Sequence, residues 1–138
     1  MKRLLFLFAV VLLQACDYSI YYEFKVENAT DLTLDMVLPG NSPDDRKVVY
    51  IRPRTTVQVH VDSPFMGGKF DIPEDVIPGD SLLPSCAVYG FSAAGEPIPE
   101  RFRQRMYWDF EASERLGVYT LTVTPGMLDD SGAENPDL

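Results

Sequence analysis

A period-two alternation of apolar and polar side chains is the feature that most constrains the fold of this chain. From Tyr18 to Glu27, aromatic and aliphatic residues occupy every even position and mostly polar residues every odd one. The same period returns at residues 32–38, 55–62, 100–111 and 118–124. Successive side chains of a strand point to opposite faces, so this period predicts half-buried strands. Four prolines from Pro64 to Pro84 argue against a long helix in the middle of the chain.

These runs predict a single all-β domain of about 7–8 short strands. We expect a β-sandwich, and a small open barrel is the competing architecture. Residues 18–27 and 32–38 are separated by turn residues and predict a hairpin. Further strands are expected at residues 47–51, 55–62, 86–92, 100–111 and 118–124, with one helical turn at residues 73–76. The turn Asn28-Ala29-Thr30 also fits the N-glycosylation pattern, but a tight turn explains these residues more simply.

The first 15 residues have the three parts of an export signal. Lys2 and Arg3 are followed by ten apolar residues, Leu4 to Leu13, and then by the small residue Ala15. Ten apolar residues are too few for a transmembrane helix, which needs about 20. We therefore expect residues 1–15 to be a cleaved signal peptide and the mature protein to be extracytoplasmic.

The end of this leader, Leu13-Gln14-Ala15-Cys16, resembles the lipobox of small bacterial lipoproteins. In that family a large aliphatic residue lies three positions before the cysteine and a small one directly before it. The resemblance implies that Cys16 becomes the first residue and carries a diacylglyceryl group on its thiol and a further acyl chain, such as palmitate, on its amine. Two or three acyl chains hold a protein stably on a membrane, whereas one chain does so only marginally.

A second resemblance concerns the fold. Ile51-Arg52-Pro53 leads into a β-branched run, and this resembles immunoglobulin-like sandwiches in which a proline corner precedes the strand that crosses to the second sheet. With the leader and the closing phrase Tyr119 to Thr124, the chain is similar to uncharacterised lipoproteins of Bacteroidetes. The resemblance implies that the β-sandwich expected at residues 16–128, after the signal peptide at residues 1–15, is immunoglobulin-like. Residues 129–138 are acidic with little to bury, and we expect them to form a flexible tail. No catalytic residues come with it.

Charge and cysteine content limit the partners. The leader holds two of the 12 basic residues and none of the 21 acidic ones, so the mature chain has a net charge of −11. Such a chain repels nucleic acid phosphates, and we expect no nucleic acid partner. Acylation of Cys16 would leave Cys86 without a disulfide partner. No histidine or cation is adjacent to Cys86 in the sequence, so we expect it to be a small buried apolar residue.

Enzymes need a nucleophile with a base, a carboxylate pair or a metal set. The only histidine, His60, is expected to point outward from its strand, opposite Val57, Val59 and Val61. Asp109 and Glu111 share a predicted strand face, but such carboxylates are routine on solvent-facing strands. We therefore predict no enzymatic activity, no cofactor and no metal site.

The strongest candidate contact site is the run Arg101, Arg103, Arg105 and Tyr107 on the outward face of the strand expected at residues 100–111. Its inward face would carry Phe102, Gln104, Met106, Trp108 and Phe110. Like charges so close together repel each other unless opposite charges pair with them. Two interpretations stay open: internal pairing with Asp or Glu, and contact with an anionic glycan, lipid head group or protein strand. Separately, Asp80-Ser81-Leu82 resembles the short O-glycosylation signal of exported Bacteroidetes proteins, which makes Ser81 a candidate modification site.

The sequence thus predicts a lipoprotein anchored to the cell membrane or outer membrane through the lipid on Cys16. Its expected role is that of a non-catalytic interaction or accessory subunit for an envelope protein or glycan. The alternative is a carbohydrate-binding module that uses Tyr21, Tyr107 and Trp108 as stacking faces, although Trp108 is expected in the core. Because the alternation begins at Tyr18, directly after Cys16 and Asp17, the domain is expected to sit against the bilayer.

Overall fold

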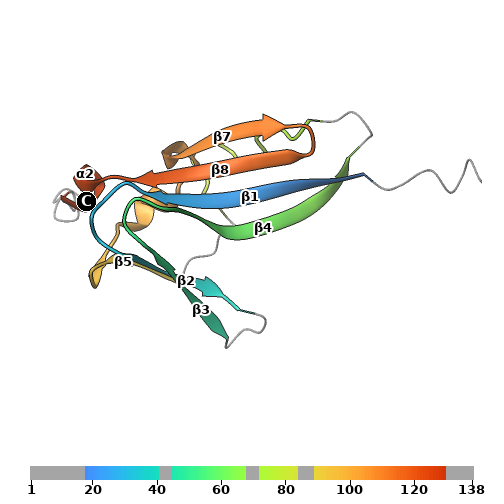
Figure 1. The fold of residues 1–138 in the computed structure, drawn as a ribbon. Helices are drawn as coiled ribbons and strands as arrows, with labels where there is room; N and C mark the ends of the chain where they lie inside the picture. Colours follow the sequence, from blue (N-terminus) through green and yellow to red (C-terminus); the bar gives the residue numbers. More distant parts are fainter. Residues whose placement is uncertain (1–17, 41–44, 68–71, 84–88, 130–138) are drawn as a thin grey trace, which may run out of the picture.

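The computed structural model describes residues 18–40, 45–67, 72–83 and 89–129. These residues form eight strands in two four-stranded sheets, in agreement with the expected all-β sandwich. Sheet A has the strand order β4-β1-β8-β7, and sheet B has the order β3-β2-β5-β6. Figure 1 shows sheet A as one layer above strands β2, β3 and β5 of sheet B.

Sheet A is built around the first strand of the chain. In spatial order its strands are β4 (Thr56–Gly67), β1 (Tyr18–Asn28), β8 (Leu116–Val123) and β7 (Trp108–Ser113). β1 pairs antiparallel with β4 and parallel with β8, and β7 pairs antiparallel with β8. The predicted alternation is confirmed in both central strands, because their inward residues are buried: Ile20, Tyr22, Phe24, Val26, Tyr119, Leu121 and Val123.

Sheet B is the smaller sheet. In spatial order its strands are β3 (Arg46–Ile51), β2 (Leu34–Pro39), β5 (Gly90–Ala93) and β6 (Glu96–Pro97), and all neighbours are antiparallel. In β2, Leu34, Met36 and Leu38 are buried, and the residues between them are only half-buried. The period-two pattern therefore gives this sheet one inner face and one outer face.

The chain changes sheets between β1 and β2, so the predicted hairpin of residues 18–27 and 32–38 is wrong. The fully buried side chain of Asn28 directs this crossing. Its Nδ2 donates to the carbonyl oxygens of Leu32 (2.7 Å) and Ile51 (3.0 Å). Its Oδ1 accepts from the backbone N–H (3.0 Å) and the hydroxyl (2.7 Å) of Thr30. The Asn28 amide thus joins the end of β1 to sheet B. This supports the interpretation of Asn28-Ala29-Thr30 as a tight turn and not as a glycosylation site.

The chain crosses back between β3 and β4, at the expected proline corner. Arg54 lies there with a φ of 58°, in the left-handed region that non-glycine residues rarely adopt. Its backbone N–H donates to the carbonyl oxygen of Asn28 at 2.9 Å, and its guanidinium pairs with Asp31 at 3.0 Å. The first two of the four crossings between the sheets therefore meet at Asn28.

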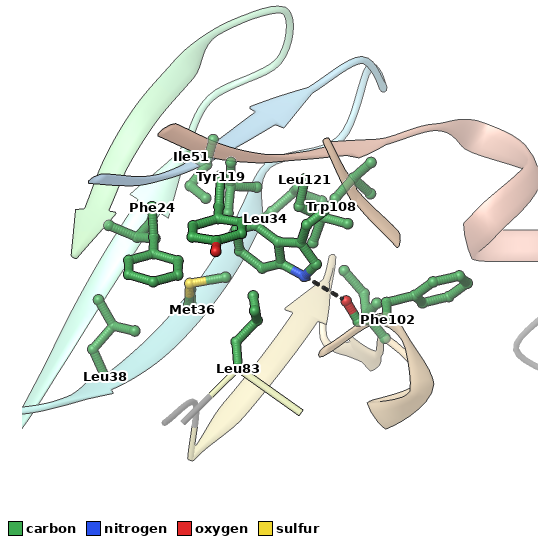
Figure 2. Packing of buried hydrophobic residues seen from close by; sticks show 14 of the residues in the cluster. Phe24, Leu34, Met36, Leu38, Ile51, Leu83, Phe102, Trp108, Tyr119 and Leu121 are labelled. Carbon is green, nitrogen blue, oxygen red and sulfur yellow. Dashed lines mark hydrogen bonds between the residues drawn. The ribbon is translucent and has the colours of Figure 1, made fainter. Parts of the chain in front are cut away.

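The core between the sheets is centred on aromatic rings. Phe24 and Tyr119 stack with their centroids 5.2 Å apart, and Trp108 meets Phe24 edge-on at 6.2 Å. Leu34, Met36, Leu38 and Ile51 of sheet B face these rings, and Leu83 and Phe102 close the cluster (Figure 2). Trp108 is 3% exposed, as expected for a core residue, and its Nε1 donates to the carbonyl oxygen of Phe102 at 3.0 Å. Burial of each such side chain contributes about 1.5–3 kcal/mol.

Several local predictions differ from the structure. Residues 73–76 form no helical turn. The pairing of β4 with β1 shifts register at two places, so Val61 is 44% exposed and His60 is half-buried, with its ring 5.8 Å from that of Phe24. The strand expected at residues 86–92 begins at Gly90, and Cys86 lies outside the described residues. A short helix, α2 (Pro125–Asp129), follows β8, and most of the expected tail also lies outside the described residues.

Candidate interaction surface

The arginine run does not lie on a strand. The prediction for residues 100–111 is wrong in its first half, where two 3-10 helices form: η2 (Glu100–Arg103) and η3 (Arg105–Tyr107). Pro99 precedes η2 with a φ of −53°, which suits the start of a helix. A 3-10 helix has three residues per turn, so positions two apart no longer share a face. Phe102 is therefore buried, whereas Met106, expected inward, is 66% exposed.

The turns separate the three arginines, and each has a local contact. The Arg101 guanidinium lies over the Phe102 ring, 5.0 Å from its centroid. Arg103 Nη1 pairs with Glu100 at 2.6 Å, and Arg105 pairs with Asp75. Tyr107, expected outward, is half-buried and meets the Phe102 ring edge-on at 4.8 Å. Internal pairing, one of the two interpretations, thus describes Arg103 and Arg105.

Asp75 is the centre of a polar network that the sequence did not reveal. Its carboxylate accepts from Arg105 Nε (2.8 Å to Oδ2, 3.0 Å to Oδ1) and from the Tyr119 hydroxyl (2.8 Å). It also accepts from the backbone N–H of Ile77 at 3.3 Å. The Arg105 guanidinium donates further to Asp75 through Nη2, and through Nη1 to the carbonyl oxygen of Trp108. One carboxylate therefore connects the loop at residues 72–83 to η3 and β8.

Two tyrosines of sheet A hold the same loop from the core side. The Tyr119 hydroxyl accepts from the backbone N–H of Val76 at 3.2 Å. The Tyr22 hydroxyl donates to the carbonyl oxygen of Glu74 at 3.0 Å. Their phenolic groups lie on the inner face of sheet A, so the loop covers part of that face.

The ionisation of this network is fixed by its own contacts. Burial raises the pKa of Tyr119, and its hydrogen bond to the Asp75 carboxylate raises it further. Burial also raises the pKa of Tyr22. For Asp75, burial acts to raise the pKa, but the hydrogen bonds from Arg105 and Tyr119 outweigh it and the pKa is lowered. The hydrogen bond to Asp75 raises the pKa of Arg105. All four shifts move away from neutral pH, so the network suits holding the loop rather than exchanging protons.

Large apolar side chains face solvent around this network. Val76 is 45% exposed, Leu82 43% and Met106 66%. The segments that carry them lie side by side. Leu82 and Gln104 form an isolated antiparallel β-bridge, and the backbone N–H of Arg105 donates to the carbonyl oxygen of Ser81 at 2.9 Å. Exposed apolar residues rimmed by polar ones are typical of interaction sites. We name the exposed side chains of residues 72–83 and 100–107 the contact surface.

A groove of about 250 Å³ adjoins the contact surface. Its lining includes Tyr89, Phe91, Pro97, Pro99, Glu100 and Arg103. The Arg46 guanidinium lies over the Tyr89 ring, 4.8 Å from its centroid. Pockets for small-molecule ligands usually enclose about 300–1,000 Å³. The groove is thus of a size that accommodates one side chain of a partner protein.

The remaining candidate residues are dispersed. Ser81 is half-buried beside the contact surface, and Tyr21 is 46% exposed on the outer face of sheet A, far along the chain from it. Asp109 and Glu111 are exposed on the outer face of β7, as expected. Trp108 offers no stacking face to a sugar, because it is buried, and Tyr107 is packed against Phe102. Cys16 lies outside the described residues.

Asp75 and Tyr119 are the structurally central residues that sequence reasoning missed. The period of residues 118–124 puts Tyr119 on one face with Leu121 and Val123, but it does not identify the partner that a buried tyrosine hydroxyl needs. Asp75 lies 30 residues from Arg105 and 44 from Tyr119, in a stretch for which the sequence predicts only one helical turn. The one available signal for such a network was the excess of arginine at residues 101–105. Neighbouring guanidinium groups repel each other unless carboxylates from other segments pair with them.

Comparisons with models of protein families, with curated proteins and with solved structures gave no match. Among the residues that the structure describes, no cluster of three or more His, Cys, Asp or Glu side chains is arranged to hold a metal ion. Within the same part of the chain, no helix has the length and apolar character needed to cross a membrane.

Proposed function

We propose that this protein is an extracytoplasmic lipoprotein, anchored through lipid on Cys16, whose immunoglobulin-like β-sandwich acts as a non-catalytic interaction subunit at the cell envelope. The anchor rests on the leader and on Leu13-Gln14-Ala15-Cys16. The immunoglobulin-like type is supported by the proline corner between β3 and β4, two strands that belong to different sheets.

The contact surface carries the proposal of an interaction subunit. Val76, Leu82 and Met106 are exposed on two segments without regular strands, and Asp75, Arg105 and Tyr119 hold those segments in place. A surface that is already ordered loses little conformational entropy on binding. Exposed apolar side chains in such a setting favour a protein partner, with the adjoining groove receiving one of its side chains.

Lipidation is tested by metabolic labelling with an alkyne analogue of palmitate in the native bacterium. We expect the wild-type chain to be labelled and to sediment with membranes, and the Cys16→Ser variant to be unlabelled and released. Membrane sedimentation of Cys16→Ser equal to that of the wild type would contradict the anchor.

The interaction role is tested by a photo-cross-linking side chain placed at Met106 in living cells. The matched control is Glu111, which is exposed on the outer face of β7. We expect a discrete cross-linked protein from position 106 that is missing from position 111. The same adducts from both positions would show random collisions and contradict a specific partner at the contact surface.

A further inference from the structure

The start of β1 is tied to the position of Cys16 by covalent geometry. β1 begins at Tyr18, two residues after Cys16. An extended chain advances at most about 3.6 Å per residue, so the Cα atom of Tyr21 lies within about 18 Å of that of Cys16. A lipid on Cys16 places that residue at the level of the head groups. Provided that the proposed anchor is correct, Tyr21 lies near the membrane surface.

The outer face of sheet A changes character along β1. Residues that are directly opposite on paired strands share a face. Nearest the start of β1, Tyr21 is opposite Leu116, which is opposite Ser113 on β7. Tyr21 is 46% exposed and Leu116 is half-buried. Ser19, nearer still to the start of β1, shares this face, so this end combines one aromatic and one aliphatic side chain with two serines and carries no charge within the strands.

Charges appear as the strands run away from that end. In the next row Glu23 lies between Val61 and Val118, and Glu111 follows on β7. In the row beyond it, Thr120 of β8 separates Lys25 from Asp109 of β7, and the Lys25 ammonium pairs with Glu23 at 3.0 Å. The last row contains Glu27, whose carboxylate accepts from the Thr122 hydroxyl at 3.1 Å. The outer face of sheet A thus runs from uncharged to acidic over the length of β1.

We propose that Tyr21 and Leu116 contact the bilayer that carries the Cys16 lipid, while the acidic half of the same face stays in water. Tyrosine suits the membrane interface because its ring is apolar and its hydroxyl is polar. The exposed carboxylates of Glu27 and Glu111 would lose hydration and be repelled by anionic lipids if they entered the head groups, so they limit how deeply the domain sits. The turn between β7 and β8 carries one charge of each sign, Glu114 and Arg115, which suits zwitterionic head groups.

Figure 1 shows the geometry that results. The start of β1, the end of β4 and the turn between β7 and β8 lie at one end of sheet A, and α2 lies at the other. The bilayer would meet the first end, and the crossings at Asn28 would point away from it.

The test uses the full lipidated chain, reconstituted into phosphatidylcholine vesicles with or without brominated acyl chains. Tyr21→Trp is the probe, and Glu27→Trp is the matched control on the same strand and face, about 20 Å farther along. Trp108 is buried and provides the same background in both variants. We expect the added indole at position 21 to shift to shorter wavelength and lose fluorescence in brominated vesicles, and the one at position 27 to do neither.

Two results would overturn the inference: no quenching at position 21, or equal quenching at positions 21 and 27. Leu116→Trp is a second probe from another strand, if Tyr21→Trp does not fold. Flotation with the vesicles is measured in the same samples. Protein that floats without quenching refutes only this inference, whereas wild-type protein that floats no better than Cys16→Ser refutes the anchor.

Discussion

Arg103 and Arg105 are two residues apart in one arginine run, and the structure predicts that their replacement by methionine changes stability by very different amounts. Arg105 is 15% exposed and pairs with an Asp75 that is 37% exposed. Arg103 is 26% exposed and pairs with a Glu100 that is 72% exposed. Methionine keeps most of the side-chain volume in both variants, so that the lost polar contacts dominate the difference.

The expected loss for Arg105→Met follows from the groups that it leaves behind. Removing one partner of a buried ion pair costs about 3–5 kcal/mol. Water reaches part of the Asp75 carboxylate, and this screening reduces the expected loss to about 2–3 kcal/mol. For a domain of this length, that corresponds to a decrease in Tm of roughly 10 °C.

Arg103→Met should change stability by less than about 1 kcal/mol. Its ion pair with Glu100 is largely exposed, and such pairs contribute about 0–1 kcal/mol. Its Nε is buried and has no hydrogen-bond partner among the described residues, and the variant removes that unfavourable burial. The loss of the pair and the relief of the unpaired donor therefore offset each other.

The assay is urea unfolding of the mature chain with Cys16→Ser, followed by the fluorescence of Trp108. This indole is the chain's only one and is buried against Phe24, so it reports loss of the core. Equal losses for Arg103→Met and Arg105→Met would refute the reasoning, because they would mean that burial and partners do not distinguish the two arginines.

Three further outcomes follow from the structure. Because the pKa of Asp75 is lowered on folding, its ionised carboxylate stabilises the folded state above its unfolded pKa of about 3.9, and this stabilisation is lost as the pH falls through the folded pKa. In urea unfolding across this range, the wild type should be more stable than Asp75→Asn, and the free energies of unfolding of the two should converge only in acid. Asn28→Ala should cost about 3–4 kcal/mol, since three buried hydrogen bonds and one partly buried one are lost, and a loss under about 1 kcal/mol in urea unfolding would contradict this role. Gly117→Ala would place a Cβ 2.8 Å from the Tyr22 ring and should lower the Tm, whereas Gly126→Ala, with nothing within 4 Å, should leave it unchanged in thermal scans.

The strands were predictable wherever one face of a strand is buried along its whole length. In β1 and β8 the burial alternates strictly, and period two identified both strands and their inward residues. The same pattern misled at residues 100–107, because Pro99 starts 3-10 turns and the backbone there bonds to the loop at residues 72–83. Alternation records which residues are apolar, and it does not record which backbone groups have strand partners.

The candidate site could be predicted only in part for a related reason. The excess of arginine at residues 101–105 was visible, and internal pairing was one of its two interpretations. The partner carboxylate of Arg105 was not visible, because Asp75 lies in a loop whose path depends on Tyr22 and Tyr119. The path of this loop also determines which apolar side chains of the contact surface are exposed.

The sequence by itself determined the all-β class, the inward residues of the central strands and the burial of Trp108, because these depend on local periodicity and on the hydrophobic effect. Only the tertiary structure decided which strands share a sheet. Residues 18–27 and 32–38 have the pattern of a hairpin, yet they lie in different sheets, because the buried Asn28 amide bonds to Leu32 and to Ile51 of β3. Contacts between residues distant in the chain are chosen by the geometry of the whole fold, and no local pattern records them.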